Sequence, residues 1–295
     1  MSFHPVFTGV CTALVTPFTK DKVDLKALDA LIDRQLEAGV PALLACGTTG
    51  EPSTMTDEEW TLVVRRVIEH VNGRAFVIAG TGSNNPRHTI EKAHIAQDLG
   101  ADAQLCVTPY YNKTTQAGLI TFFTHIADST ALPLILYNVP ARTGLTMLPE
   151  TVEKLSHHPQ IVGIKEAGSD LHAMAQIMRS CQLPVYCGND DFNCSALRLG
   201  ADGVISVLSN LLPAEVVRLY REIKAGNILS AEARQKSLEK ITRALFIETS
   251  PVPVKEALAQ LHLMQPDVRL PLVRMQAENL RILLAAMQEK GLLEA

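Results

Sequence analysis

Short apolar runs recur along the first two thirds of the chain, separated by longer stretches of mixed polarity. One of them, Ile161-Val-Gly-Ile164, shows no alternation of apolar and polar residues and runs straight into Lys165. A run of this kind is typical of a strand that is covered on both faces, as in a parallel sheet. Comparable runs predict eight strands, at residues 8–17, 42–47, 75–80, 103–109, 133–138, 161–165, 184–188 and 203–207.

The stretches between these runs have the periodicity of amphipathic helices. The first helix is predicted to follow the N-cap residue Asp24 and to place Leu28, Ile32 and Leu36 on one face. A second is predicted to begin around residues 56–59, where three acidic residues suit the positive end of the helix dipole.

Eight strands that alternate with helices predict a closed barrel, because parallel strands joined by right-handed crossovers close at about eight. The sequence Leu99-Gly-Ala-Asp102 recurs as Leu199-Gly-Ala-Asp202, each time between a helix and a strand, as repeated βα units would have it. We therefore predict an α/β fold, a (β/α)8 TIM barrel. The catalytic barrel is assigned to residues 1–225 and a C-terminal helical domain to residues 226–295.

Beyond about residue 211 the strand pattern stops, and four helices are predicted, at residues 214–225, 231–248, 254–262 and 270–290. The last is expected to carry one apolar stripe, formed by Val273, Ala277, Leu280, Leu284 and Met287. The first of the four should complete the barrel, and the other three should form the C-terminal extension.

Charge and composition narrow the range of partners. The chain has 27 basic and 31 acidic residues, a net charge of −4, and no long run of either sign, which argues against nucleic acid or an anionic membrane. The N-terminus lacks the regions of a signal peptide, and no apolar run approaches the roughly 20 residues of a membrane span. We expect a cytoplasmic protein that acts on small molecules.

Metals and cofactors are not expected. The six cysteines include no C-x-x-C pair, and several lie in apolar runs, so they are interpreted as core residues in a reducing compartment. Gly80-Thr-Gly82 lacks the third glycine and the downstream acid of a dinucleotide site. Asp190-Asp191 has no histidine or third acid at the spacing that a metal site needs.

Lys165 is an unusual residue at the end of a buried strand. Desolvating an ammonium group is costly, so this side chain must reach water, pair with a carboxylate or lose its proton. A neutral lysine amine is a nucleophile toward carbonyl carbon. The sequence of this strand alone leaves all three possibilities open.

Other strand ends add chemistry to the same predicted rim, since the carboxyl ends of barrel strands converge on one mouth. The loop Gly47-Thr-Thr-Gly50 offers backbone N–H groups and hydroxyls to a small anion, Tyr137 offers a phenol, and Arg142 can grip a carboxylate. Singly, these residues could be an ordinary turn, a packed tyrosine and a surface arginine. Together with Lys165 they predict Schiff-base formation with a 2-oxo acid, followed by a class I aldol reaction.

Four motifs carry a resemblance to a known superfamily. They are Gly47-Thr-Thr-Gly-Glu51, Thr108-Pro-Tyr-Tyr-Asn-Lys113, Tyr137-Asn-Val-Pro-Ala-Arg-Thr-Gly144 and Gly163-Ile-Lys-Glu-Ala167. In order and spacing the chain resembles the dihydrodipicolinate synthase and N-acetylneuraminate lyase superfamily over most of its length.

The resemblance implies a role for each site residue. Lys165 would form the Schiff base with pyruvate, and Tyr137, Thr48 and Tyr111 would form the proton relay. Tyr111 would come from a neighbouring subunit, which implies a homo-oligomer, at least a dimer and usually a tetramer built from dimers. Three further residues are implied in pyruvate binding or in lining the pocket: Thr49, Gly188 and Ile205.

Arg142 is the residue that discriminates within the superfamily. In the synthases an arginine in this loop binds the carboxylate of aspartate semialdehyde, whereas the sialic acid lyases lack it. The implied reaction is therefore condensation of pyruvate with L-aspartate 4-semialdehyde to 4-hydroxy-tetrahydrodipicolinate, on the path to diaminopimelate and lysine. The alternatives are another pyruvate-dependent aldolase, acting on N-acetylneuraminate or a 2-keto-3-deoxy sugar acid, and an inactive barrel with a binding or regulatory role.

The sequence departs from the superfamily at its lysine feedback site. Strongly inhibited members have histidines after the first motif and a glutamate after the strand-three asparagine. By this resemblance, the corresponding positions are occupied here by Asp57, Trp60 and His88. Two other residues of that site, Asn84 and Tyr110, are kept. Weak or absent inhibition by lysine is therefore expected.

Overall fold

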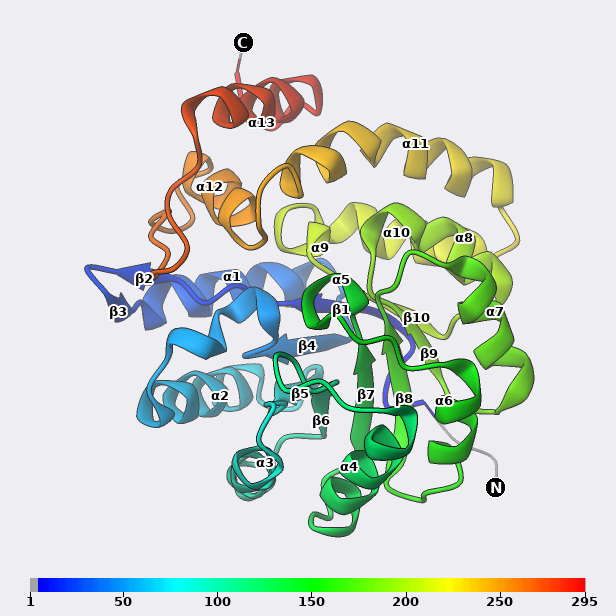
Figure 1. Ribbon diagram of the computed structural model, residues 1–295. Coiled ribbons are helices and arrows are strands. Elements are labelled where there is room, and N and C mark those ends of the chain that lie inside the picture. Colours follow the sequence, from blue (N-terminus) through cyan, green and yellow to red (C-terminus); the bar gives the residue numbers. More distant parts are fainter. Residues whose placement is uncertain (1–4, 295) are drawn as a thin grey trace.

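The computed structural model describes residues 5–294, and its centre is a closed barrel of eight parallel strands (Figure 1). Going round the barrel, the strand order is β1-β10-β9-β8-β7-β6-β5-β4, and β4 pairs again with β1. The strands are β1 (Gly9–Ala13), β4 (Ala42–Ala45), β5 (Phe76–Gly80), β6 (Ala103–Val107), β7 (Leu134–Asn138), β8 (Ile161–Glu166), β9 (Val185–Cys187) and β10 (Gly203–Ser206). The prediction of eight barrel strands is confirmed, and most of the strands are shorter than predicted.

Helices surround the barrel and connect its strands (Figure 1). They are α1 (Leu25–Glu37), α2 (Asp57–Val71), α3 (Pro86–Leu99), α4 (Gln116–Asp128), α5 (Pro140–Thr143), α6 (Pro149–Leu155), α7 (Leu171–Ser180), α8 (Asn193–Leu199), α9 (Leu208–Leu211) and α10 (Pro213–Lys224). The two predicted helix starts are confirmed. Asp24 accepts a hydrogen bond from the N–H of Ala27, and Thr56 forms a capping box with Glu59.

A small hairpin was not predicted. β2 (Phe18–Thr19) and β3 (Lys22–Val23) pair in antiparallel fashion beside the barrel. Lys20 and Asp21 between them both have positive φ, 50° and 63°, as the tight turns of hairpins require. Strands of two residues are too short to produce a recognisable pattern of apolar and polar positions.

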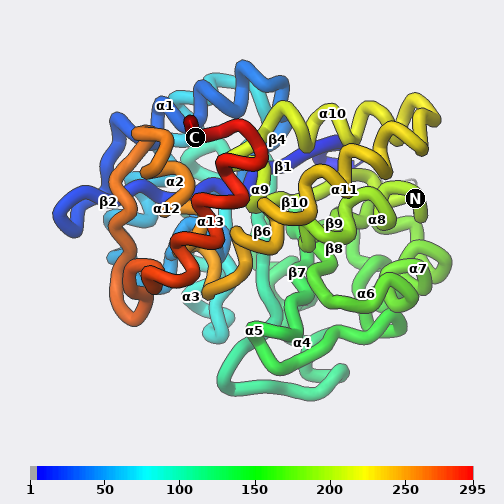
Figure 2. Tube along the Cα trace, turned by 90° about the horizontal axis from the view of Figure 1, so that it is seen from above, coloured from blue at the N-terminus to red at the C-terminus, as the bar shows by residue number. Residues whose placement is uncertain are grey.

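Three further helices form the C-terminal extension: α11 (Ile228–Leu245), α12 (Val252–Gln260) and α13 (Ala277–Glu289). They gather at one side of the barrel in both views (Figure 1, Figure 2), where α11 packs against α10 and α12 against α9. Among residues 5–294, no helix has both the length and the apolar character needed to cross a membrane.

The predicted start of the last helix is wrong. The helix begins at Ala277 rather than 270, and Val273 is 62% exposed in the segment before it. Gln276, the N-cap residue, has an extended backbone with φ −66° and ψ 142°, so the helix does not continue back beyond it. The buried face of α13 is formed by Leu283, Ala286 and Met287, so only part of the predicted stripe faces the protein.

Two apolar regions make up the core. One fills the barrel and contains Cys11, Tyr137 and Ile205; the other lies between the strands and the surrounding helices. Five of the six cysteines are buried and all six are free thiols, in agreement with their interpretation as core residues. Burial raises the pKa of Cys46 and Cys187 to about 12, so both thiols are neutral near pH 7.

Arg269 ties the segment before α13 to the first turn of α2. Its guanidinium donates two hydrogen bonds of 2.6 Å to the carboxylate of Glu59 and a third of 2.6 Å to the backbone carbonyl of Asp21. The hydrogen bonds from Arg269 hold the pKa of Glu59 below its ordinary value. A carboxyl group whose pKa is lower in the folded than in the unfolded protein stabilises the fold at pH values above its unfolded pKa. This stabilisation is lost as the pH falls through its folded pKa.

The substitution Arg269→Met should therefore lower the free energy of unfolding by about 2 kcal/mol near neutral pH. The difference from wild type should shrink as the pH falls from 7 to below 4, which urea unfolding at pH 7 and pH 3.5 measures. Arg243→Met is the control, because Arg243 is 75% exposed and 3.7 Å from Glu239, and it should change stability by less than ~0.5 kcal/mol. A pH-independent difference for Arg269→Met contradicts the expectation.

Candidate active site

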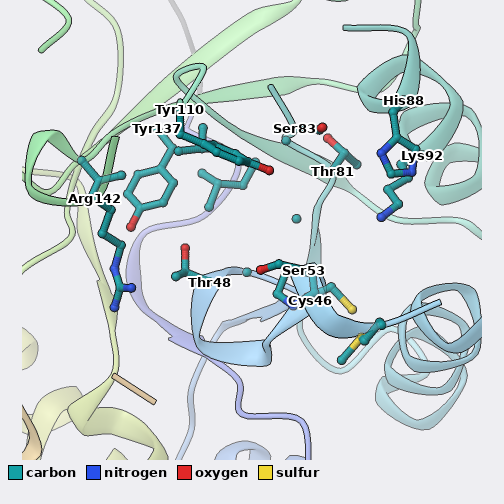
Figure 3. A pocket seen from close by; sticks show the side chains of 18 of the residues that line it. Cys46, Thr48, Ser53, Thr81, Ser83, His88, Lys92, Tyr110, Tyr137 and Arg142 are labelled. Atoms are coloured by element: carbon teal, nitrogen blue, oxygen red, sulfur yellow. The ribbon is translucent and has the colours of Figure 1, made fainter. Parts of the chain in front are cut away.

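A cavity of about 400 Å³ opens beside the carboxyl ends of β4 to β7. Figure 3 shows Thr48, Tyr137 and Arg142 together at one end, and His88 and Lys92 at the other. The predicted convergence of strand-end residues is therefore seen for three of the site residues.

Lys165 and Tyr137 are brought together by strand pairing. The register of β7 and β8 sets Tyr137 directly opposite Lys165, and the lysine Nζ lies 4.5 Å from the centroid of the tyrosine ring. Each residue is 6% exposed. Because Tyr137 lines the cavity, the Lys165 amine lies against one of the side chains that line it.

Of the two residues predicted to line the pocket, Gly188 lies against Lys165 and Ile205 lies inside the barrel. A Cβ added to Gly188 would come within 2.9 Å of Lys165 Cε, so only glycine leaves room for the lysine side chain there. Ile205 is fully buried inside the barrel, in the same apolar cluster as Tyr137, and pairs with Cys11 across the β1–β10 seam. Gly188 thus leaves room for the Lys165 side chain, and Ile205 belongs to the barrel interior that also contains Tyr137.

Glu166, the next residue in β8, does not serve as the partner of Lys165. Its carboxylate accepts hydrogen bonds from the Asn138 side chain at 2.8 Å and from the Gly168 N–H at 2.6 Å. Burial raises the pKa of Glu166, and these hydrogen bonds oppose that rise. Successive side chains of a strand point to opposite faces, so Glu166 points away from Lys165.

The loop after β4 contains two 3-10 turns, Thr48–Gly50 and Pro52–Thr54, and the first carries the two threonines. The turn closes through a 2.8 Å hydrogen bond from the Gly50 N–H to the Gly47 carbonyl. Thr48 is exposed and lines the cavity, and its hydroxyl and that of Tyr137 project into the same region (Figure 3). Thr49 is 5% exposed, and its side chain is not part of the cavity lining.

Arg142 reaches the cavity from the short helix α5. Its Nη2 donates a 3.0 Å hydrogen bond to the backbone carbonyl of Ser250, which fixes the guanidinium at the rim. Arginine has five N–H donors, so others remain for a ligand. The side chain is otherwise exposed, as a residue that meets an incoming substrate should be.

Tyr111 stands apart from the other predicted site residues. It is 94% exposed, has a φ of 69° and does not line the cavity of its own chain. Tyr110 lines that cavity instead. The role of Tyr111 in a neighbouring subunit therefore stays a prediction.

The far end of the cavity holds a charged cluster whose full composition was missed from the sequence. The Asp57 carboxylate lies 3.2 Å from His88 Nε2 and 3.6 Å from Lys92 Nζ, and Lys92 lies over the ring of Trp60 at 5.3 Å. The hydrogen bond from His88 is the main reason that the pKa of Asp57 is lowered. Lys92 could have been found from its spacing, since it follows His88 by four residues and so shares its helix face.

A closed barrel that buries a lysine at a strand end, beside a tyrosine and a cavity, defines a (β/α)8-barrel enzyme. The chain belongs to the dihydrodipicolinate synthetase family, whose sequence model matches residues 6–290.

Named relatives agree with this assignment. An Exiguobacterium protein named 4-hydroxy-tetrahydrodipicolinate synthase is 48% identical, with 96% of this chain and 98% of the relative covered. A Geobacter metallireducens protein of the same name is 46% identical, with 98% and 100% covered.

Solved structures are similarly close. Dihydrodipicolinate synthase from Thermotoga maritima superposes with a TM-score of 0.96 at 40% identity, covering 98% of this chain and 100% of that one. The Acinetobacter baumannii enzyme, solved in complex with pyruvate, gives 0.95 at 39% identity, covering 97% and 99%. The structural likeness thus extends over nearly the whole chain.

Proposed function

We propose that this enzyme condenses pyruvate with L-aspartate 4-semialdehyde to give 4-hydroxy-tetrahydrodipicolinate, a step toward diaminopimelate and lysine. The observation that carries the proposal is the buried Lys165 amine against the ring of Tyr137, which lines a cavity together with Thr48 and Arg142. The names of the relatives and the pyruvate complex of a similar structure support it.

The first half of the reaction is Schiff-base chemistry on Lys165. Its neutral Nζ attacks the ketone carbon of pyruvate, and water leaves to give an imine whose carboxylate rests on Thr48 and Thr49. The nitrogen of this imine is protonated. A proton then leaves the pyruvate methyl carbon through Tyr137, Thr48 and the Tyr111 of a neighbouring subunit, and the protonated imine becomes a neutral enamine.

The second half forms the carbon–carbon bond. The enamine carbon attacks the aldehyde carbon of the semialdehyde, and the aldehyde oxygen takes up a proton from the relay. The carboxylate of that substrate is held by Arg142, whose planar guanidinium suits two parallel hydrogen bonds. The substrate's own amine then replaces Lys165 at the imine carbon, which closes the ring and frees the enzyme.

A comparison of the enzyme's activity with different substrates tests the proposal against its alternatives. We expect condensation with aspartate semialdehyde, followed by formation of the cyclic product, and no cleavage of N-acetylneuraminate or a 2-keto-3-deoxy sugar acid at a comparable rate. Trapping with borohydride in the presence of pyruvate separates an enzyme from an inactive barrel, because only an imine is reduced to a stable adduct. A protein that forms no adduct contradicts the proposal.

The proposed working form is a cytoplasmic homo-oligomer, at least a dimer and in the usual case a tetramer built from two dimers. A fully exposed tyrosine with a left-handed backbone is well placed to enter a neighbouring site, which supports the predicted donation of Tyr111. A structure 40% identical to this chain is described as the first monomeric variant of a dihydrodipicolinate synthase, which implies that oligomers are the rule among such enzymes.

Lysine is expected to inhibit this enzyme weakly or not at all. At the far end of the cavity, the Asp57 carboxylate already faces two basic side chains, His88 and Lys92, and a bound lysine would bring another ammonium group beside them. The Trp60 N–H is also engaged, donating to the Gly80 carbonyl at 3.1 Å. Initial rates at saturating substrates should therefore change little with lysine at ~1 mM, and half-inhibition well below that concentration would contradict the expectation.

A further inference from the structure

Glu51 lies directly behind the turn that carries Thr48 and Thr49. It is 4% exposed and has a left-handed backbone, with φ 58° and ψ 42°. A residue with a side chain adopts this conformation only where the surrounding contacts hold it there. Whatever holds Glu51 therefore also sets the position of the turn.

Both carboxylate oxygens of Glu51 are held by the C-terminal extension. Oε1 lies 2.5 Å from the Nζ of Lys255 in α12, and Oε2 accepts a 3.2 Å hydrogen bond from the backbone N–H of Arg269. Lys255 is completely buried, and its ammonium also lies 4.3 Å from the centre of the Phe18 ring. A buried ion pair thus joins α12 to the catalytic loop across 204 residues of sequence.

The same part of the extension reaches the other side of the cavity. Ser250, two residues before α12, accepts the 3.0 Å hydrogen bond from Arg142. One short segment, residues 250–255, therefore contacts both the loop that binds the first substrate and the arginine proposed to bind the second.

We infer that Lys255 is a positioning residue, which fixes the Thr48-Thr49 turn through Glu51 in the geometry that binds the carboxylate of pyruvate. The inference rests on the proposed function. Apolar packing alone would also keep α12 against the barrel. The ion pair in addition fixes the orientation of Glu51, which directly follows the turn Thr48–Gly50. Both oxygens of its carboxylate are held.

The test compares Lys255→Met with the double variant Glu51→Gln/Lys255→Met. The single variant leaves the Glu51 carboxylate buried without its cation, so it should lose stability. The double variant leaves no unpaired buried charge and should recover much of that loss. The readout is the pyruvate concentration that gives half-maximal borohydride trapping at Lys165, measured without the second substrate, beside a thermal melt.

A second ion pair provides the matched control. Arg234 of α11 contacts Glu222 of α10 at 2.9 Å, with side chains 12% and 10% exposed, and neither residue lines the cavity. Arg234→Met/Glu222→Gln should affect the melting temperature without changing the pyruvate dependence.

A rise of fivefold or more in the half-saturating pyruvate concentration of the folded double variant supports the positioning role, provided that the control pair stays within twofold of wild type. A smaller rise, or an equal rise in the control, overturns it. The double variant keeps the test decisive if Lys255→Met does not fold. Absence of an adduct in the wild-type protein would instead contradict the proposed function, so the two failures are distinguishable.

Discussion

Replacing Lys165 with alanine is expected to abolish the condensation, with kcat lowered at least about a thousandfold. Without the amine no imine forms, and the pyruvate methyl carbon keeps its protons. Mass spectrometry after borohydride treatment with pyruvate should show the adduct mass on wild-type protein and none on Lys165→Ala. Peptide mapping should place the adduct on the peptide that contains Lys165.

Two other lysines make this test specific. Lys154, exposed in the last turn of α6, is the surface control, and Lys154→Ala should trap pyruvate as wild type does. Lys255 is even more deeply buried than Lys165, but its ammonium is paired with Glu51. An adduct that survives Lys165→Ala, or that maps to Lys255, means that the nucleophile has been assigned wrongly.

Arg142→Ala is expected to separate the two substrates. Losing a charge-assisted pair of hydrogen bonds to the semialdehyde carboxylate should lower kcat/KM for that substrate about a hundredfold, equivalent to roughly 3 kcal/mol. Pyruvate trapping should remain within about threefold of wild type, because Lys165 and Thr48 are untouched. Steady-state kinetics with the semialdehyde varied, combined with borohydride trapping, measures both effects.

Arg142→Lys refines this result. Lysine keeps the positive charge but cannot offer the planar pair of donors, so it should recover only part of the loss. Unchanged activity with the semialdehyde in Arg142→Ala would remove the reason for preferring this substrate over those of other pyruvate-dependent aldolases.

Much of the barrel could be predicted from the sequence because its strands are buried on both faces. That burial produces continuous apolar runs such as Ile161 to Ile164. The number of these runs, eight, predicted the closed barrel. The site followed from the same logic, since parallel strands bring their carboxyl ends to one mouth. Tyr137 and Lys165 were predicted at the ends of two consecutive strands, and they are direct neighbours in register.

The features that were missed depend on contacts between distant parts of the chain. Lys255 lies in a segment correctly predicted as helical, yet no local pattern reveals that its partner is Glu51. The start of α13 was misplaced because apolar periodicity was followed back past Gln276, whose backbone is extended. Periodicity reports which face of an element is buried and does not report what lies opposite.

The seam between β1 and β10, where Gly9 pairs with Gly203, has a consequence for how the chain folds. It is the contact of greatest sequence separation in the barrel, and such contacts form late because a long loop must first be closed. During synthesis the ribosome must release residue 206 before the last strand can meet the first. Until then β1 presents an unpaired edge to other nascent chains, so the interval before the seam closes is when this protein is most exposed to aggregation.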